Sequence, residues 1–207
     1  MADDSRHPAP PTRSERKRAD ILSAARDAFL EQGYERVVME ATARRAGVST
    51  ATLYRHFPSK SDLFEAVAAA TMDELDASFP PPADDPIMRL EEIAVAYAEH
   101  LSRPDVRAFV RMLVAETGRN ASLADIFYDA IKTRLSDIFA EAILAGARAG
   151  VLQPTDDPAH AAGQLQGMIE HGTLMRGLVL GDAVPPPVDP ATIAREAFAT
   201  WRARWVA

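Results

Sequence analysis

The sequence predicts an all-α protein of about nine helices, and three observations lead to that fold class. Apolar residues recur every three or four positions along most of the 207-residue chain, which is the period of an amphipathic helix. Residues that start and end helices bracket these segments, mainly serine, aspartate, proline and glycine. No segment has a run of alternating β-branched residues long enough for a strand.

The first predicted helix follows an arm, residues 1–13, in which prolines and charged residues dominate. We expect this arm to be disordered, because it has little apolar surface to bury. Thr12 and Glu15 have the spacing of a capping box at the start of the helix. Gly33 suits the left-handed backbone conformation that commonly ends a helix.

Two short helices come next, and a tight turn is predicted between them. The segment 39–46 has helical spacing and ends at Gly47. The next helix begins after Ser49, a good N-cap residue, and is broken by Pro58. The remaining predicted helices cover 59–75, 90–101, 109–116, 123–149, 158–179 and 189–205, with proline-containing loops among their connections.

Charge is distributed unevenly along the chain. The net charge is −7, but residues 1–60 carry +3 and residues 61–207 carry −10. A basic end on an acidic body is the asymmetry expected of an N-terminal module that meets phosphates. The chain has no cysteine, which excludes disulfides and thiolate chemistry.

The chain also lacks sequence signals for membrane insertion or export. No apolar run approaches the length that spans a bilayer, and the N-terminal residues contain no apolar core of a signal peptide. We therefore expect a cytoplasmic protein without a membrane partner.

Residues 38–57 have the spacing of a helix-turn-helix. Ala43, Gly47 and Leu53 supply a small residue at the helix crossing, a turn glycine and an inward-facing anchor. The polar residues that remain are Thr50, Thr52, Tyr54, Arg55 and His56, whose donors are short enough to enter a major groove. The spacing alone leaves open a plain helical hairpin with a polar surface.

The segment ILSAARDAFLEQGYERVVMEATARRAGVSTATLYRHFPSKSDLFEAV resembles the N-terminal domain of the TetR family of transcriptional repressors. The matching residues are Ala25, Phe29, Gly33, Tyr34, Ala43, Ala46, Gly47, Val48, Ser49, Thr52, Leu53, Tyr54, Phe57, Lys60 and Leu63. The segments LVAETGRNASLADIFYDA and DDPAHAAGQL are similar to the AefR-like C-terminal domain of that family.

The resemblance implies a helix-turn-helix DNA-binding domain over 14–62 and a ligand-binding and dimerisation domain over 63–207. It implies an operator-binding homodimer, with DNA contacts from Arg44, Ser49, Thr50, Ala51, Thr52, Tyr54, Arg55, His56 and Lys60. Three positions depart from the family pattern. Val38 replaces the usual capping threonine, Thr42 replaces an apolar residue, and Thr50 replaces the lysine or glutamine that is common after Ser49. Thr42 weakens the hairpin packing unless its hydroxyl bonds a backbone carbonyl.

Two apolar stripes predict the dimer interface, which we expect to be a four-helix bundle made by two helices from each chain. The candidates are Leu165, Gly172, Val179, Ala194, Phe198, Trp201 and Trp205. The alternative for both stripes is core packing within one chain.

Methionines, aromatics and a few polar residues in the C-terminal part suggest an adaptable site for a small apolar or aromatic effector. The candidates are Tyr97, Phe109, Met112, Glu116, Tyr128, Met168, His171 and Met175. For each of them, ordinary core packing is the alternative.

The sequence has no glycine-rich phosphate loop, nucleophile motif or Glu-x-x-His pair, so it predicts neither an enzyme nor a cofactor or metal site. The leading hypothesis is a ligand-responsive repressor that binds a palindromic operator as a dimer. The alternative is an all-α small-molecule-binding or interaction protein without sequence-specific DNA binding.

Overall fold

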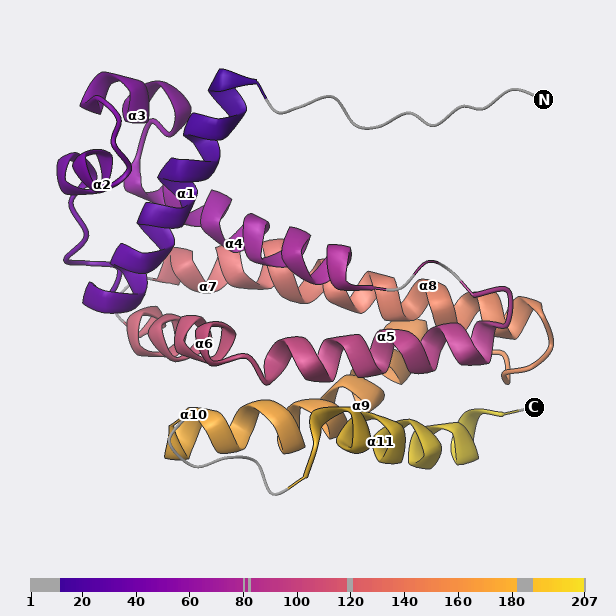
Figure 1. Cartoon of the computed structure of the whole chain (residues 1–207). Helices are drawn as coiled ribbons and strands as arrows, with labels where there is room; N and C mark the ends of the chain where they lie inside the picture. The colour runs from indigo at the N-terminus through magenta and orange to yellow at the C-terminus, as the bar shows by residue number, and fades with distance from the viewer. Residues whose placement is uncertain (1–11, 80, 82, 119–120, 182–187, 207) are drawn as a thin grey trace, which may run out of the picture. The chain divides into compact units, whose positions relative to one another are not determined.

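The computed structural model describes residues 12–79, 81, 83–118, 121–181 and 188–206 (Figure 1). Its elements are α1 (Arg13–Gln32), α2 (Met39–Arg45), α3 (Thr50–His56), α4 (Lys60–Ser78), α5 (Pro86–Leu101), α6 (Pro104–Thr117), α7 (Ala121–Phe127), η1 (Tyr128–Thr133), α8 (Arg134–Arg148), α9 (Pro158–Glu170), η2 (His171–Met175), α10 (Arg176–Leu180) and α11 (Pro190–Trp205). Two π-helical turns, η1 and η2, join α7 to α8 and α9 to α10. The described residues therefore form nine continuous helices and no strand, which confirms the predicted fold class.

The ends of the helices follow from local sequence. Thr12 caps α1, and its side chain and that of Glu15 bond each other's backbone N–H, so the predicted capping box is confirmed. Gly33 ends α1 with φ 77° and ψ 160°, a positive φ but not the left-handed helical conformation that we predicted. Helices α5 and α6 begin earlier than their apolar patterns, because each starts at a proline. The predicted disordered arm lies outside the described residues, apart from its last two positions.

The chain forms two compact units, Met1–Val67 and Ala68–Ala207, and the division between them falls within α4. In the first unit, α1 contributes Ile21, Ala25 and Phe29 to the core, and α4 contributes Leu63 and Phe64. The rings of Phe29, Tyr34 and Phe64 lie within 5.7 Å of one another, centroid to centroid. This core holds α2 and α3 through their buried sides.

In the second unit, α5 packs against α6, α8, α9 and α11 (Figure 1). Its buried residues include Leu90, Ile93 and Tyr97. Trp201 of α11 is 2% exposed, and its indole N–H donates to the Ala161 carbonyl of α9 at 2.8 Å. No helix among the described residues is long and apolar enough to cross a membrane.

Most of the candidate interface residues pack inside this unit. Leu165, Ala194, Phe198 and Trp201 are at most 3% exposed and belong to the chain's own core. The small size of Gly172 serves a contact within the chain, because an added Cβ would lie 2.7 Å from Ile193 of α11. Trp205 stacks on Trp201, and its indole N–H donates to Gln164. Val179 alone of the seven candidates is largely exposed, at 74%. Four of the seven candidates are therefore core residues of the chain, and the dimer interface stays a prediction.

The turn between α2 and α3 depends on Gly47, which has φ 66° and lies at the position after the C-cap of α2. The N–H of Val48 bonds the Ala43 carbonyl at 3.0 Å, which closes the turn. A Cβ at Gly47 would meet no atom within 4 Å, so only the backbone conformation requires glycine.

Replacing Gly47 by alanine is expected to lower the free energy of unfolding of the N-terminal unit by about 1–2 kcal/mol. Gly163, an exposed glycine within α9 that also has open space around it, is the matched control. Gly163→Ala is expected to raise stability by about 0.5–1 kcal/mol, because it removes a flexible residue from a helix. Urea unfolding of both variants, followed by circular dichroism, measures this difference, and equal effects would contradict it.

Candidate nucleic-acid interface

Helix α3 has a buried side and an exposed side. Leu53 is 0% exposed and Phe57, its C-cap, is 4% exposed, so both anchor the helix to the core of the first unit. Thr50, Ala51, Tyr54 and Arg55 are exposed. The helix therefore presents short polar side chains and an arginine to its surroundings, while its apolar side fixes its direction.

Helix α2 packs against α3, and two of the departures from the family pattern, Val38 and Thr42, lie at its start and within it. Val38 is the N-cap and makes no side-chain cap hydrogen bond, as its chemistry requires. Thr42 is buried, and its hydroxyl donates to the Val38 carbonyl at 3.1 Å. The sequence predicted that Thr42 would weaken the packing unless its hydroxyl bonded a backbone carbonyl, and the structure contains such a bond.

One predicted DNA contact lies inside the unit. Thr52 is only 9% exposed, its N–H donates to the Ser49 hydroxyl, and the two hydroxyls lie 2.9 Å apart. Ser49 is the N-cap of α3, so this pair fixes the start of the helix. Thr52 is therefore a structural residue in this fold, because its side chain faces the interior rather than the exposed side of α3.

The basic residues around α3 differ in how firmly they are held. The Lys60 ammonium donates to the Glu35 carbonyl at 3.0 Å and lies 4.6 Å from the centre of the Tyr34 ring. Arg44 and Arg55 are exposed, whereas His56 is half-buried, with an Nε2 that has no hydrogen-bond partner. Lys60 is thus fixed at the first residue of α4, close to the α1–α2 connection.

Two contacts in this region were not predicted. Arg45 of α2 bonds Glu31 and Asp27 of α1, and these carboxylates raise the pKa of its guanidinium. The Tyr54 hydroxyl donates to a carboxylate oxygen of Glu40 on α2 at 3.3 Å. Desolvation and the negative charge of Glu40 raise the pKa of Tyr54. Each contact joins residues fourteen or more positions apart, so no local pattern could have revealed it.

An exposed polar helix, anchored by its apolar side and preceded by a tight glycine turn, is the arrangement of a helix-turn-helix DNA-binding protein. Residues 21–67 match the family described as bacterial regulatory proteins, tetR family, and residues 88–206 match the AefR-like transcriptional repressor, C-terminal domain. The chain belongs to the TetR family of bacterial transcriptional regulators. It is a DNA-binding regulator by family and fold, and members of this family act as dimers and are not enzymes.

Similar proteins span several regulators. The chain is 31% identical over 170 residues to the nucleoid occlusion factor SlmA of Photobacterium profundum, covering 77% of this chain and 83% of that protein. It is 42% identical over 59 residues to the transcriptional activator FasR of Mycolicibacterium smegmatis, covering 28% of this chain and only 27% of the activator. The solved structure of the flavonoid-responsive regulator FrrA is 28% identical, with a TM-score of 0.75, and the match covers 92% of this chain and 97% of that one.

The candidate effector residues differ in how deeply they are buried. Tyr97, Phe109 and Met112 are buried, and Glu116 is 8% exposed with one carboxylate oxygen that has no hydrogen-bond partner. Met168 packs at the edge of the core, whereas Tyr128, His171 and Met175 are exposed. Helical spacing identified which residues are apolar, but it could not show that they face different sides of the helices.

Polar contacts gather instead around Glu170, at the end of α9. One Glu170 oxygen accepts from the Tyr97 hydroxyl at 2.5 Å and from the Lys132 ammonium at 2.6 Å. Burial, and secondarily the charge of Glu170, raises the pKa of Tyr97. Lys132 and Glu170 border a groove of about 450 Å³ that also includes Tyr128, Gln166 and Gly167. Gln166 is 5% exposed, and its buried amide nitrogen has no hydrogen-bond partner.

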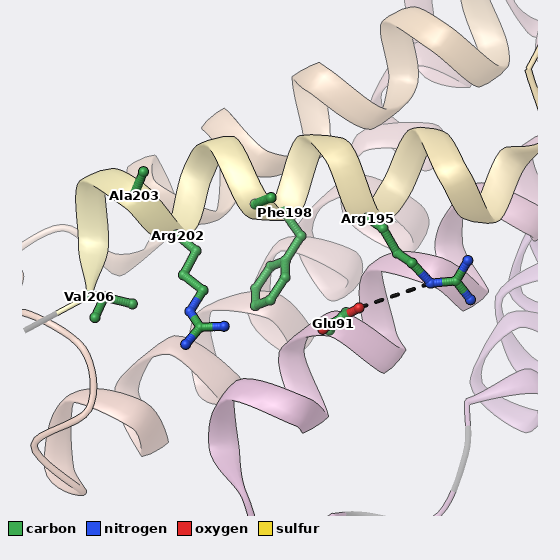
Figure 2. A pocket seen from close by; sticks show the side chains of 7 residues that line it. Glu91, Arg195, Phe198, Arg202, Ala203 and Val206 are labelled. Carbon is green, nitrogen blue, oxygen red and sulfur yellow. Dashed lines mark ion pairs between the residues drawn. The ribbon is translucent and has the colours of Figure 1, made fainter.

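A second hollow, of about 510 Å³, lies between α5 and α11 (Figure 2). Figure 2 shows the Phe198 ring directed from α11 toward α5, with Arg195 and Arg202 on either side of it along α11. The Arg195 guanidinium lies 4.0 Å from Glu91. The arginines are exposed, so this is a surface hollow, and none of the eight candidate effector residues lines it.

Proposed function

We propose that this protein is a transcriptional repressor that binds a palindromic operator as a homodimer and is released by a small-molecule effector. The observation that carries the proposal is α3, an exposed polar helix with an apolar side fixed in the core of the first unit. The repressor assignment is supported by the match of residues 88–206 to a repressor C-terminal domain. The match to the activator FasR covers too little of that protein to argue for activation.

Dimerisation supplies the geometry of operator recognition. Two recognition helices must lie about 34–36 Å apart to enter successive major grooves on one face of the duplex. The surface that we propose for the partner is the outer side of η2 and α10, where Met175, Val179 and Leu180 are 48%, 74% and 50% exposed. Exposed apolar side chains clustered in this way are typical of contact surfaces.

The effector site that we propose is the groove beside Glu170. It combines the unpartnered Gln166 amide and the Lys132 ammonium with the exposed Tyr128 ring, so it suits a molecule with an aromatic body and a hydrogen-bond acceptor. Glu170 immediately precedes η2, and π-helical turns are frequent at functional sites. An effector releases DNA only if it binds the two states of the dimer unequally.

Lys60→Ala is expected to weaken binding to every duplex to a similar extent, because Lys60 would meet a phosphate rather than a base. The slope of log affinity against log salt concentration should fall in magnitude by about 0.9, the value for one phosphate contact. Fluorescence anisotropy with an operator duplex at four salt concentrations measures the slope. Arg148→Ala, which removes an exposed charge at the end of α8, is the control and should leave the slope unchanged. Equal slopes for wild type and Lys60→Ala would remove Lys60 from the interface.

A further inference from the structure

Glu40 is an acidic residue at the border of the DNA-binding surface. It is the second residue of α2, it is exposed, and it accepts the hydrogen bond of Tyr54, which lies on the exposed side of α3. When a helix-turn-helix docks, the second helix enters the major groove and the first crosses the phosphate backbone. A side chain shared between the two helices therefore lies where phosphates pass.

The Tyr54 hydroxyl has one proton to donate, and in the free protein the Glu40 carboxylate accepts it. A DNA phosphate that accepts the hydrogen bond of the Tyr54 hydroxyl must displace the Glu40 carboxylate. The phosphate then lies close to this carboxylate, which carries the same sign of charge. Both effects weaken binding: one hydrogen bond is exchanged rather than gained, and the like charges repel at short range.

Two of the cations near Glu40 have other partners, whereas Arg44, four residues further along α2, is exposed. Arg45, on the same helix, is held by Glu31 and Asp27, and Lys60 is held at the Glu35 carbonyl. The acid can favour the first turn of α2 through the helix dipole, particularly since Val38 provides no cap. If Glu40 only stabilised the start of α2, its replacement would change the stability of the protein and leave its affinity for DNA unchanged.

We propose that Glu40 is an affinity-limiting residue, which holds the Tyr54 hydroxyl in the free protein and repels the DNA backbone in the complex. The proposal rests on the DNA-binding function. With Glu40 in place, contacts to the DNA phosphates contribute less to the binding affinity than the same surface would contribute without this acid. A repressor limited in this way can be released by the modest coupling of about 5-fold to 150-fold that is typical of effectors.

Glu40→Gln is expected to tighten binding by about threefold to tenfold at low salt, for the operator and for an unrelated duplex alike, because phosphates are the same in both. In a Tyr54→Phe background the gain should shrink by at least half, since the contested hydroxyl is gone. Anisotropy titrations of wild type, both single variants and the double variant measure this. Glu65→Gln, which removes an exposed acid from α4 in the same unit, is the charge-matched control and should change affinity by less than twofold.

Thermal unfolding of each variant establishes that it is folded, and Glu40→Gln should melt only slightly below wild type. The proposal is overturned if Glu40→Gln changes affinity by less than twofold, weakens binding, or matches Glu65→Gln. The proposal is also overturned if Glu40→Gln raises the affinity for DNA as much in the Tyr54→Phe background as in wild type. A wild-type protein that binds no duplex would refute the DNA-binding function itself, which is a different result.

Discussion

Replacing Trp201 by alanine is expected to lower the free energy of unfolding of the C-terminal unit by about 3–5 kcal/mol, the range for a large aromatic removed from a core. Trp201 is 2% exposed, and its ring stacks between Phe198 and Trp205 at centroid distances of 6.2 and 6.0 Å. The variant loses this packing and the donor to the Ala161 carbonyl. Urea unfolding followed by far-ultraviolet circular dichroism measures the loss.

Two further variants separate the contribution of the Trp201 hydrogen bond to stability from that of its packing. Trp201→Phe keeps most of the ring but leaves the Ala161 carbonyl without its donor, so a smaller cost of about 1–3 kcal/mol is expected. Thr200→Ala, next along α11, alters an exposed side chain and should stay within about 0.5 kcal/mol of wild type. A tolerated Trp201→Ala would contradict the packing of α11 on α9 within the chain.

Replacing Ala51 by glutamate is expected to weaken operator binding by about 100-fold or more, because like charges brought together in an interface cost several kcal/mol. Ala51 is exposed on α3, between Thr50 and the buried Thr52. The substitution places a carboxylate where base edges and phosphates would approach. Because the position is exposed, the melting temperature should stay close to that of wild type.

The control adds the same charge elsewhere. Ala203→Glu alters an exposed alanine on α11, in the other compact unit, and should change operator affinity by less than about threefold, since α11 carries none of the proposed DNA contacts. A folded Ala51→Glu protein with unchanged operator affinity would show that α3 is not the recognition helix.

The helices, their caps and the turn at Gly47 were predictable because their determinants are local. These determinants act within a few positions of each other, as in the capping box of Thr12 and Glu15. They are the helical period of apolar residues, the N-cap residues, the prolines and a glycine with positive φ. The π-helical turns were not predictable, because helical periodicity passes through them without a change that composition would show.

The interface was predictable only in part, because exposure depends on what lies opposite. Tyr54 and Thr52 both follow the N-cap of α3 and both are polar, yet only Tyr54 is exposed, because Thr52 bonds Ser49 in the interior. The apolar stripes of α9 and α11 could pack within the chain or against another chain, and the structure places most of their residues in the chain's own core, beside α5. The Glu40–Tyr54 contact joins different helices and could come only from the fold.

The most direct test of the DNA-binding account is a titration of the purified protein with the duplex immediately upstream of its own coding region. Unrelated competitor DNA is present in excess, at two salt concentrations. A dimeric DNA-binding regulator is expected to bind saturably and to stay bound in the presence of the competitor, with one dimer, or a whole number of dimers, per duplex. If this duplex fails, fragments selected from the whole genome replace it in the same assay. Binding that is equal for every fragment and is erased by competitor would contradict the account.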